Sequence, residues 1–402
     1  MILGAGVYQA PLIRRARARG LYTLAVSIPG NYPGFALADQ ALYLNTRDAE
    51  AAAEAARREG VQAVATTGTD VAMPALAAVC EALGLPGISR ESAAMATDKI
   101  RMKEAFLAGG VGTSPFRAVR SPEEALAAAE EIGYPVMMKI PDQSGSRGIT
   151  RAENPEALRE AWDFSRKATR AGQLLVEGFV EGREFGIDAA VQGGRLLAVI
   201  PHEKRVHFSR RTGVPEGHLC PADFSPETEE AIRRETEKIV RALGLRDCAV
   251  NVDAMLTPEG MISVIEAAAR CGGTGIPEVV GGYLGLSWYD VILDLALGIP
   301  VKLPGPEEIL CCGRAAASRI IIGSRAGRLK EISYEAEGRR IVNADWEGES
   351  LQVSLNAVPG DPVSEFDSGP ERLGQAVFLG KSRAEILAAE ESFLRSLRVI
   401  AE

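Results

Sequence analysis

The segment Asn251-Val-Asp-Ala-Met-Leu-Thr-Pro-Glu-Gly-Met-Ile-Ser-Val-Ile-Glu-Ala-Ala-Ala-Arg270 decides how this chain is interpreted. Cys248–Leu256 and Met261–Ala267 have the composition of two strands, and Thr-Pro-Glu-Gly is typical of the turn between them. Because side chains alternate along a strand, Asp253 and Glu266 fall on one face, either opposite or diagonal to each other. Two carboxylates on a half-buried face repel unless a cation separates them, and Mg²⁺ favours such oxygen ligands. The alternative is two solvated acids on an open sheet.

Arg270 follows this hairpin and precedes the glycine-rich segment Cys271-Gly-Gly-Thr-Gly275. A guanidinium group suits a carboxylate or an acyl phosphate because its donors form a planar fork. Gly272 and Gly273 would let backbone N–H groups approach an anion closely. A surface arginine before a flexible turn is the alternative interpretation.

Two lysines are candidates for binding phosphate. Lys139 lies in the apolar strand Val136-Met-Met-Lys-Ile140, where a lone ammonium group would be costly to bury, so we expect an anionic partner. The following loop, Ser144-Gly-Ser-Arg-Gly148, could hold the same phosphate. Lys99 follows Thr97-Asp98 at the start of a helix, and taken alone it reads as a solvated helix residue.

The N-terminal part alternates strands and helices, which predicts a parallel sheet with crossovers. We expect a strand ending at Gly4-Ala-Gly6, a second strand over Leu21–Ile28 and a third over Val61–Thr66. The first strand is short, so the true start could lie further upstream. Gln9 stands where a dinucleotide-binding turn expects a third glycine, and no acid ends the second strand, so NAD binding and an oxidoreductase are disfavoured. Gln9 could instead face a substrate.

All three histidines, His202, His207 and His218, lie in the most basic stretch of the chain, together with Lys204, Arg205, Arg210 and Arg211. We interpret this stretch as a substrate-facing loop, with a solvated loop as the alternative. Metal binding is less favoured because the ligand spacing is unfamiliar.

Composition narrows the class of protein. A chain of 402 residues suggests two or three domains, and 46% apolar with 25% charged residues is ordinary for a globular protein. A net charge of −9 argues against nucleic-acid binding. Six cysteines without a CxxC pair indicate reduced thiols in a cytoplasmic protein. We expect neither a signal peptide nor a membrane span.

Taken in order, these segments resemble the ATP-grasp superfamily over essentially the whole chain. The resemblance implies ATP and Mg²⁺ as cofactors, with Mn²⁺ as the alternative ion. It implies that ATP is bound by Lys99, Lys139, Ser144, Gly145, Ser146, Gly148, Glu177, Phe179, Val180 and Glu184. In Val176-Glu-Gly-Phe-Val-Glu-Gly-Arg-Glu184, the residues Glu177, Phe179 and Val180 would meet the adenine, partly through backbone groups, and Glu184 the ribose. Asp253 and Glu266 would hold the metal, and Arg270 would hold the oxyanion.

The same resemblance predicts an α/β protein with three domains. A parallel α/β pre-ATP-grasp domain would span residues 1–88, and an ATP-grasp α+β domain 89–305, with its lid at about 114–180. A small β-rich C-terminal domain would span 306–402. A homodimer is also expected from the family.

One departure from the common ATP-grasp sequence pattern narrows the choice of branch within the superfamily. Many members carry Asn two residues after the second metal acid, whereas Ala268 stands here. Similar runs occur in amino-acid ligases and in carboxyaminoimidazole ribonucleotide synthase. We therefore expect a carboxylate–amine ligase, with a purine-pathway or carboxylase-type enzyme using bicarbonate as the second hypothesis. A non-catalytic nucleotide-binding protein is the third.

Overall fold

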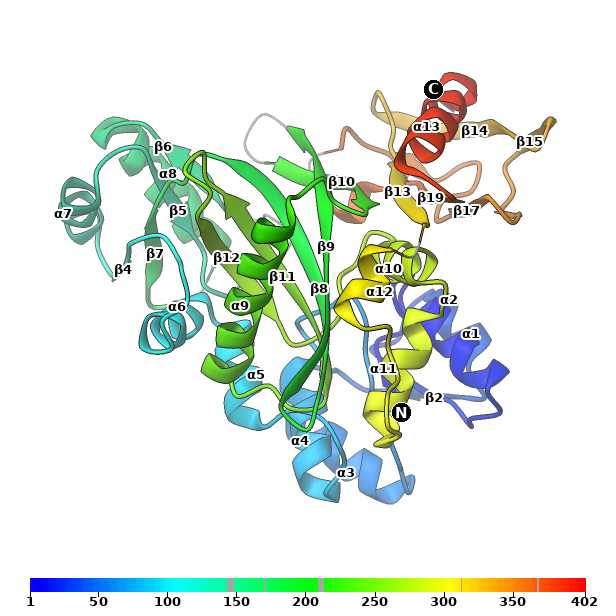
Figure 1. The fold of residues 1–402 in the computed structure, drawn as a ribbon, viewed down its shortest axis with the longest axis horizontal. Helices are drawn as coiled ribbons and strands as arrows, with labels where there is room; N and C mark the ends of the chain where they lie inside the picture. Colours follow the sequence, from blue (N-terminus) through cyan, green and yellow to red (C-terminus); the bar gives the residue numbers. More distant parts are fainter. Residues whose placement is uncertain (143–147, 170, 209–212, 312, 367–368) are drawn as a thin grey trace.

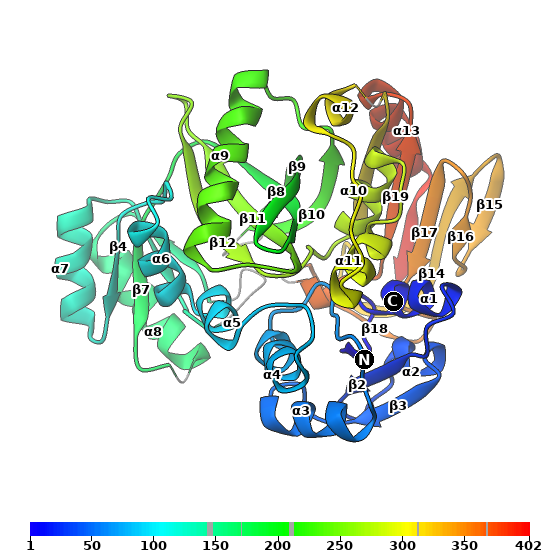
Figure 2. The same cartoon turned by 60° about the horizontal axis from the view of Figure 1, so that its bottom comes forward.

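The computed structural model describes residues 1–142, 148–169, 171–208, 213–311, 313–366 and 369–402. A large sheet runs through the middle of the molecule, with a smaller lid at one end and a β-rich unit at the other (Figure 1). The N-terminal unit lies beneath the lid, the large sheet and the β-rich unit (Figure 1). The second view shows these parts in the same arrangement (Figure 2). The molecule therefore has the three-domain α/β architecture that the sequence predicts.

The N-terminal unit is a parallel sheet in the order β1-β2-β3 with helices around it. Its elements are β1 (Ile2–Leu3), α1 (Ala10–Ala18), β2 (Leu24–Ser27), α2 (Pro33–Leu37), β3 (Gln40–Tyr43), α3 (Ala49–Arg58) and α4 (Met73–Leu83). The predicted strand at Val61–Thr66 is wrong, because β1 offers only two residues as partners and Ala65 alone bridges Ile2. β3, which was not predicted, is the third strand instead.

Two helices, α5 (Arg90–Thr97) and α6 (Lys99–Ala108), connect this unit to the lid. The lid has an antiparallel sheet in the order β4-β7-β5-β6. Its strands are β4 (Phe116–Val119), β5 (Val136–Lys139), β6 (Thr150–Ala152) and β7 (Leu174–Gly178), and its helices are α7 (Pro122–Ile132) and α8 (Pro155–Ala168). The side chains of Ser121 and Asn154 cap the two helices by accepting backbone N–H groups, as expected for such residues before proline.

The central sheet has nine strands in the order β12-β11-β8-β9-β10-β13-β19-β17-β16. Its first five are β8 (Arg183–Gln192), β9 (Arg195–Phe208), β10 (Gly213–Cys220), β11 (Cys248–Leu256) and β12 (Ile262–Ala268). The other four are β13 (Ala315–Ile321), β16 (Trp346–Glu347), β17 (Leu351–Leu355) and β19 (Gly374–Gly380). Since β10 pairs with β13, the sheet continues across the domain boundary predicted at 305/306.

The remaining elements cover this sheet or extend the C-terminal unit. The helices are α9 (Pro226–Ala242), α10 (Ile276–Leu284), α11 (Trp288–Leu297), α12 (Pro306–Leu310) and α13 (Arg383–Ser396), with a 3-10 turn at Gly369–Glu371. The strands are β14 (Gly327–Ala336), β15 (Arg339–Val342), β18 (Pro362–Val363) and β20 (Arg398–Ala401). Among the described helices, none is long and apolar enough on its own to cross a membrane; α10 and α11 pass that test only together, bent by 99°.

Alternation along β8 explains how the sheet positions a site. Phe185, Ile187, Ala189 and Val191 are buried in one hydrophobic core, which also contains Ile232 and Ile239 of α9. Glu184, Gly186 and Asp188 therefore point to the opposite face. That face carries the polar residues described next.

Candidate active site

Asp253 and Glu266 lie directly opposite each other on β11 and β12, on one face of the hairpin as the sequence predicts. An ammonium group neutralises each carboxylate. The Nζ of Lys204 lies 2.8 Å from Asp253, and the Nζ of Lys99 lies 2.9 Å from Glu266. Burial raises the pKa of Asp253 despite the nearby Lys204. Burial also disfavours the charged form of Glu266, but Lys99 outweighs it and the pKa falls to about 2.

This pair suits a hard divalent cation. Within the described part of the chain, no three His, Cys, Asp or Glu side chains converge closely enough to hold a metal ion alone. Mg²⁺ commonly binds through one or two carboxylates and completes its shell with phosphate oxygens and water. The donors present therefore fit a metal that arrives with a nucleotide, and Ala268 adds no ligand to them.

Lys139 has the anionic partner that its buried strand position predicts. Its Nζ lies 2.6 Å from Glu177, and the Nζ of Lys103 lies 2.5 Å from the other oxygen of the same carboxylate. Burial opposes ionisation of Glu177, but the two lysines lower its pKa to about 2. Burial lowers the pKa of Lys103 to about 8, partly offset by Glu177. The Glu177 side chain is thus occupied, so a contact with adenine would have to use its backbone.

The segment after β7 is the one that the sequence predicts to meet the adenine. The Phe179 ring is 38% exposed, and the guanidinium of Arg151 lies 4.0 Å from its centroid. The backbone N–H of Phe179 donates to Pro135, which removes it from the groups that could read a base. Glu184, predicted to hold the ribose, accepts from Lys204 at 2.6 Å. Lys204 therefore links the predicted ribose acid to the predicted metal acid.

Arg270 lies in a cavity of about 250 Å³ between the N-terminal unit and the central sheet. Lys99, Glu266 and Asp70 line the same cavity. The Nη2 of Arg270 lies 2.8 Å from Asp70, and its Nη1 donates to Asn251 at 3.3 Å. Burial alone would lower the pKa of Arg270, but Asp70 raises it, so the group is a permanent cation. The fork of Arg270 is thus already oriented toward a carboxylate.

The cavity brings the predicted residues Lys99, Glu266 and Arg270 together, whereas other predicted residues lie elsewhere. Gln9 is buried, and its amide is used within the protein: Oε1 accepts from Gly6 at 3.0 Å and Nε2 donates to Thr67. The contact of Gln9 with a substrate stays a prediction, and its amide would have to exchange these partners to make it. Gly148 lies after the lid loop with φ of +68°, whereas Ser144, Gly145 and Ser146 lie outside the described residues.

The basic histidine stretch is a β-hairpin of β9 and β10 and not a loop, because its residues pair with β8 and β13 on either side. His207 is 38% exposed at the side chain and lies 3.8 Å from Glu216, away from the carboxylate pair. His202 and His218 are buried and face each other. Arg210 and Arg211 fall outside the described residues.

Three charged residues of the site were missed as functional candidates. Lys103 lies four positions after Lys99, so both fall on one face of α6. Lys204 lies two positions after His202 on β9, so both share the polar face of the sheet. Asp70 belongs to the distant N-terminal unit, and nothing in its local sequence indicated a contact with Arg270.

Comparisons with known proteins agree with this geometry. Residues 132–278 match the family model of the ATP-grasp domain. D-alanine--D-alanine ligase of Geobacter sulfurreducens is 29% identical over 234 residues, which cover 56% of this chain and 72% of that protein. Alanine--anticapsin ligase of Bacillus subtilis is 26% identical over 60% of this chain, and the match spans 55% of its own length.

A solved structure resembles the whole chain. Phosphoribosylglycinamide synthetase from Anaerococcus prevotii superposes with a TM-score of 0.80 at 27% identity, covering 100% of this chain and 98% of that one. The family model, the relatives and this structure agree with the fold: residues 132–278 match an ATP-grasp domain, and the chain as a whole is similar to proteins of that architecture.

Proposed function

We propose that this protein is an ATP-dependent ligase that phosphorylates a carboxylate and joins it to an amine. One observation carries the proposal: Arg270 shares a single cavity with Lys99 and Glu266. A guanidinium that already binds a carboxylate, that of Asp70, therefore lies beside the charges that would hold a triphosphate. The relatives named as ligases support this assignment.

The nucleotide would lie between the lid and the central sheet. Phe179 and Val180 would contact the base, Glu184 the ribose hydroxyls, and Lys99 and Lys139 the phosphates. A bound Mg²⁺, held by Asp253 and Glu266, would neutralise charge on the β- and γ-phosphates. On nucleotide binding, Lys99 and Lys139 would exchange their carboxylate partners for phosphate oxygens, which keeps each ammonium paired.

The reaction follows from this arrangement in two steps. A carboxylate oxygen of the acid attacks the γ-phosphorus as the bond to the β-phosphate oxygen breaks, giving ADP and an acyl phosphate. The amine nitrogen then attacks the acyl carbon, a C–N bond forms, phosphate leaves, and the nitrogen loses a proton. Arg270 would stabilise the oxyanion of the second step, and the lysines would stabilise charge on the transferred phosphoryl group.

An amino acid is the carboxylate that we favour, because the cavity places the acidic Asp70 and the basic Arg270 side by side. Such paired charges suit a zwitterion. The second candidate is bicarbonate in a purine-pathway or carboxylase-type reaction. The full-length likeness to phosphoribosylglycinamide synthetase keeps a purine-type enzyme open.

An assay of ADP and phosphate release tests the proposal. The protein would be incubated with MgATP and a matrix of amino acids as acids and amines, with bicarbonate in a separate arm. Hydroxylamine in a third arm would trap any acyl phosphate as a hydroxamate. We expect at least one acid–amine pair to raise ADP release, with amide product detected by mass spectrometry.

The outcomes separate the hypotheses. Release with bicarbonate alone would replace the leading proposal with the carboxylase type. ATP binding without release in any arm would point to a nucleotide-binding protein without catalysis and would refute the ligase. Glu266→Gln is the inactive control, and Glu259→Gln, at the exposed hairpin turn, is its matched active control.

A further inference from the structure

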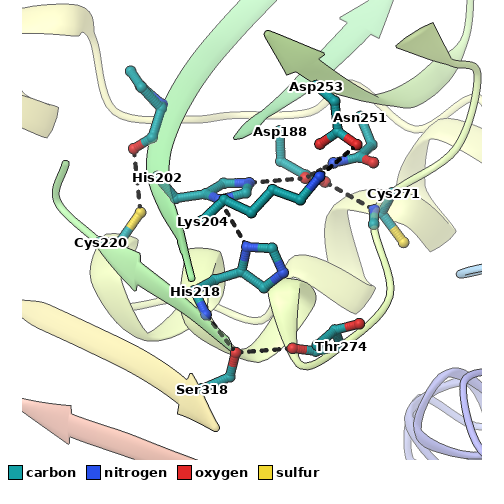
Figure 3. Close-up of polar contacts among 12 residues, drawn as sticks. Asp188, His202, Lys204, His218, Cys220, Asn251, Asp253, Cys271, Thr274 and Ser318 are labelled. Carbon is teal, nitrogen blue, oxygen red and sulfur yellow. Dashed lines mark hydrogen bonds and ion pairs between the residues drawn. The ribbon is translucent and has the colours of Figure 1, made fainter. Parts of the chain in front are cut away.

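Three buried side chains, those of Asp188, His202 and His218, form a polar row beside the segment that contains Cys271 and Thr274 (Figure 3). Asp188, His202 and His218 come from the neighbouring strands β8, β9 and β10, and their exposed fractions are 0%, 0% and 3%. The Nε2 of His202 lies 3.6 Å from Asp188, and its Nδ1 lies 3.1 Å from the Nδ1 of His218. The sequence indicated His202 and His218 only as part of a basic stretch, and it gave no signal for Asp188.

One hydrogen bond links the two rings, whereas the contact with Asp188 is longer. The Nε2 of His202 lies 3.6 Å from Asp188, which is beyond hydrogen-bond distance. Between the two Nδ1 atoms, one ring donates and the other accepts, according to the tautomers. Burial, followed by the charges of His202, Lys204 and Arg205, lowers the pKa of His218 well below its usual value, so its ring is neutral.

At one end of this row of polar side chains, Asp188 holds the glycine-rich segment. Asp188 accepts from the backbone N–H of Gly272 at 3.2 Å and from Asn251 at 2.8 Å. Asn251 in turn accepts from Arg270 at 3.3 Å. Asp188 is thus two hydrogen bonds away from the guanidinium of the site.

A serine from the C-terminal unit holds the other end. The Oγ of Ser318 on β13 accepts from the backbone N–H of His218 at 3.2 Å and donates to the carbonyl of Thr274 at 2.8 Å. Thr274 has φ of +57°, a left-handed conformation that is unfavourable for a non-glycine residue. Such a conformation persists only where its surroundings enforce it, and Ser318 supplies that restraint.

Close packing leaves the rings and the loop little room for other positions. A Cβ at Gly186 would lie 2.1 Å from Cε1 of His202, so the ring occupies the space that a side chain there would need. A Cβ at Gly275 would lie 2.7 Å from the Cβ of Ser318. The glycines therefore permit direct contact between loop, rings and serine.

We propose that Asp188, His202, His218 and Ser318 are positioning residues that fix the Gly272–Thr274 segment beside Arg270. Through Ser318, the C-terminal unit then sets the geometry of the acyl-transfer step without touching the substrate. This role rests on the proposed ligase function. Loosening the segment would expose the acyl phosphate to water, so ATP would be consumed without amide formation.

Hydrogen exchange of the ligand-free protein tests the positioning. The backbone amide of Gly272 would be followed by mass spectrometry in Asp188→Asn, which keeps the shape but replaces an acceptor oxygen with a donor, and in Ser318→Ala. We expect the exchange rate of the Gly272 amide to rise about fivefold to tenfold in each variant, because about one hydrogen bond is lost. Ser333→Ala is the matched control, because Ser333 is also buried but lies on β14.

A second pair of variants separates the polar row from simple packing. His218→Asn retains a donor near the position of Nδ1, whereas His218→Leu removes it. We expect the asparagine variant to keep exchange within about twofold of the wild type and the leucine variant to match Asp188→Asn. Unchanged exchange in Asp188→Asn and Ser318→Ala would overturn the proposal, as would equal effects of the two His218 variants.

The kinetic arm uses the acid–amine pair found by the ligase assay. We expect the ratio of phosphate released to amide formed to rise above one, while the KM for ATP stays within about twofold, because the nucleotide contacts are untouched. A ratio of one in every variant would overturn the role in acyl transfer. If the wild type joins no pair, the ligase proposal fails, and the exchange result still decides whether these residues position the segment.

Discussion

Replacing Glu177 with Gln removes the carboxylate that forms ion pairs with both Lys103 and Lys139. Glu177 is 3% exposed, so solvent screens these ion pairs little. Its pKa is about 2 in the folded protein against an ordinary 4.5. A difference of this size corresponds to about 3 kcal/mol of stabilisation at neutral pH. We therefore expect Glu177→Gln to lower the free energy of unfolding by about 3 kcal/mol.

The loss should depend on pH in a defined direction. The pKa of Lys103 is lowered from 10.5 to about 8, and without Glu177 burial would lower it further. Above the folded pKa, the unfolded chain binds the extra proton, so stability rises with pH. This rise begins at about pH 8 in the wild type and earlier in the variant. The difference between the two should shrink by up to about 1.4 kcal/mol per unit as pH rises toward 8.

Urea unfolding at pH 6, 7 and 8, followed by tryptophan fluorescence and circular dichroism, measures both quantities. Glu131→Gln is the control, because Glu131 pairs with Arg117 at the surface and its loss should cost less than about 1 kcal/mol. A loss below about 1 kcal/mol for Glu177→Gln at pH 7, unchanged at pH 8, would show that the buried lysines do not depend on this carboxylate.

Three further outcomes are expected. Glu266→Gln should reduce turnover by about a thousandfold or more in a coupled ADP assay, since the proposed metal ligand and the partner of Lys99 are lost together; near-normal turnover would remove it from the metal site. Arg270→Lys should lower kcat about tenfold to a hundredfold, because an ammonium cannot reproduce the fork; equal kcat would contradict an oxyanion role. Gly186→Ala should cost about 1–3 kcal/mol in thermal melts through overpacking, whereas Gly172→Ala, in open space, should be neutral.

Local sequence patterns predicted the elements whose signals are local. The strand β11 has the expected bounds, and Asp253 and Glu266 share a face because a strand alternates with a period of two. The hairpin of β9 and β10 was misread as a loop, since its charged residues are neutralised by partners on other strands. No helix was predicted for Ile276–Leu284, which contains a proline and two glycines; tertiary packing stabilises it instead.

Contacts between distant segments account for the rest of the site. Asp70 meets Arg270 across 200 positions, and Lys103 meets Glu177 across 74. No spacing rule links such residues, because the fold and not the chain brings them together. The apolar strand around Lys139 indicated that residue, and the resemblance to a family supplied Lys99. The roles of Lys103, Lys204 and Asp188 became visible only in three dimensions.

The ladder between β10 and β13 also bears on how enzymes of this architecture can be recombined. Gly217–Cys220 pairs residue by residue with Ala316–Arg319. Truncation of the protein after residue 305 would therefore leave β10 as an unpaired edge strand. A chimera that takes its last hundred residues from another enzyme would inherit a foreign strand next to the histidines and a foreign residue at position 318. If Ser318 has the positioning role proposed above, exchange of this segment also alters the candidate active site, and shuffled libraries should vary it together with β8 to β10.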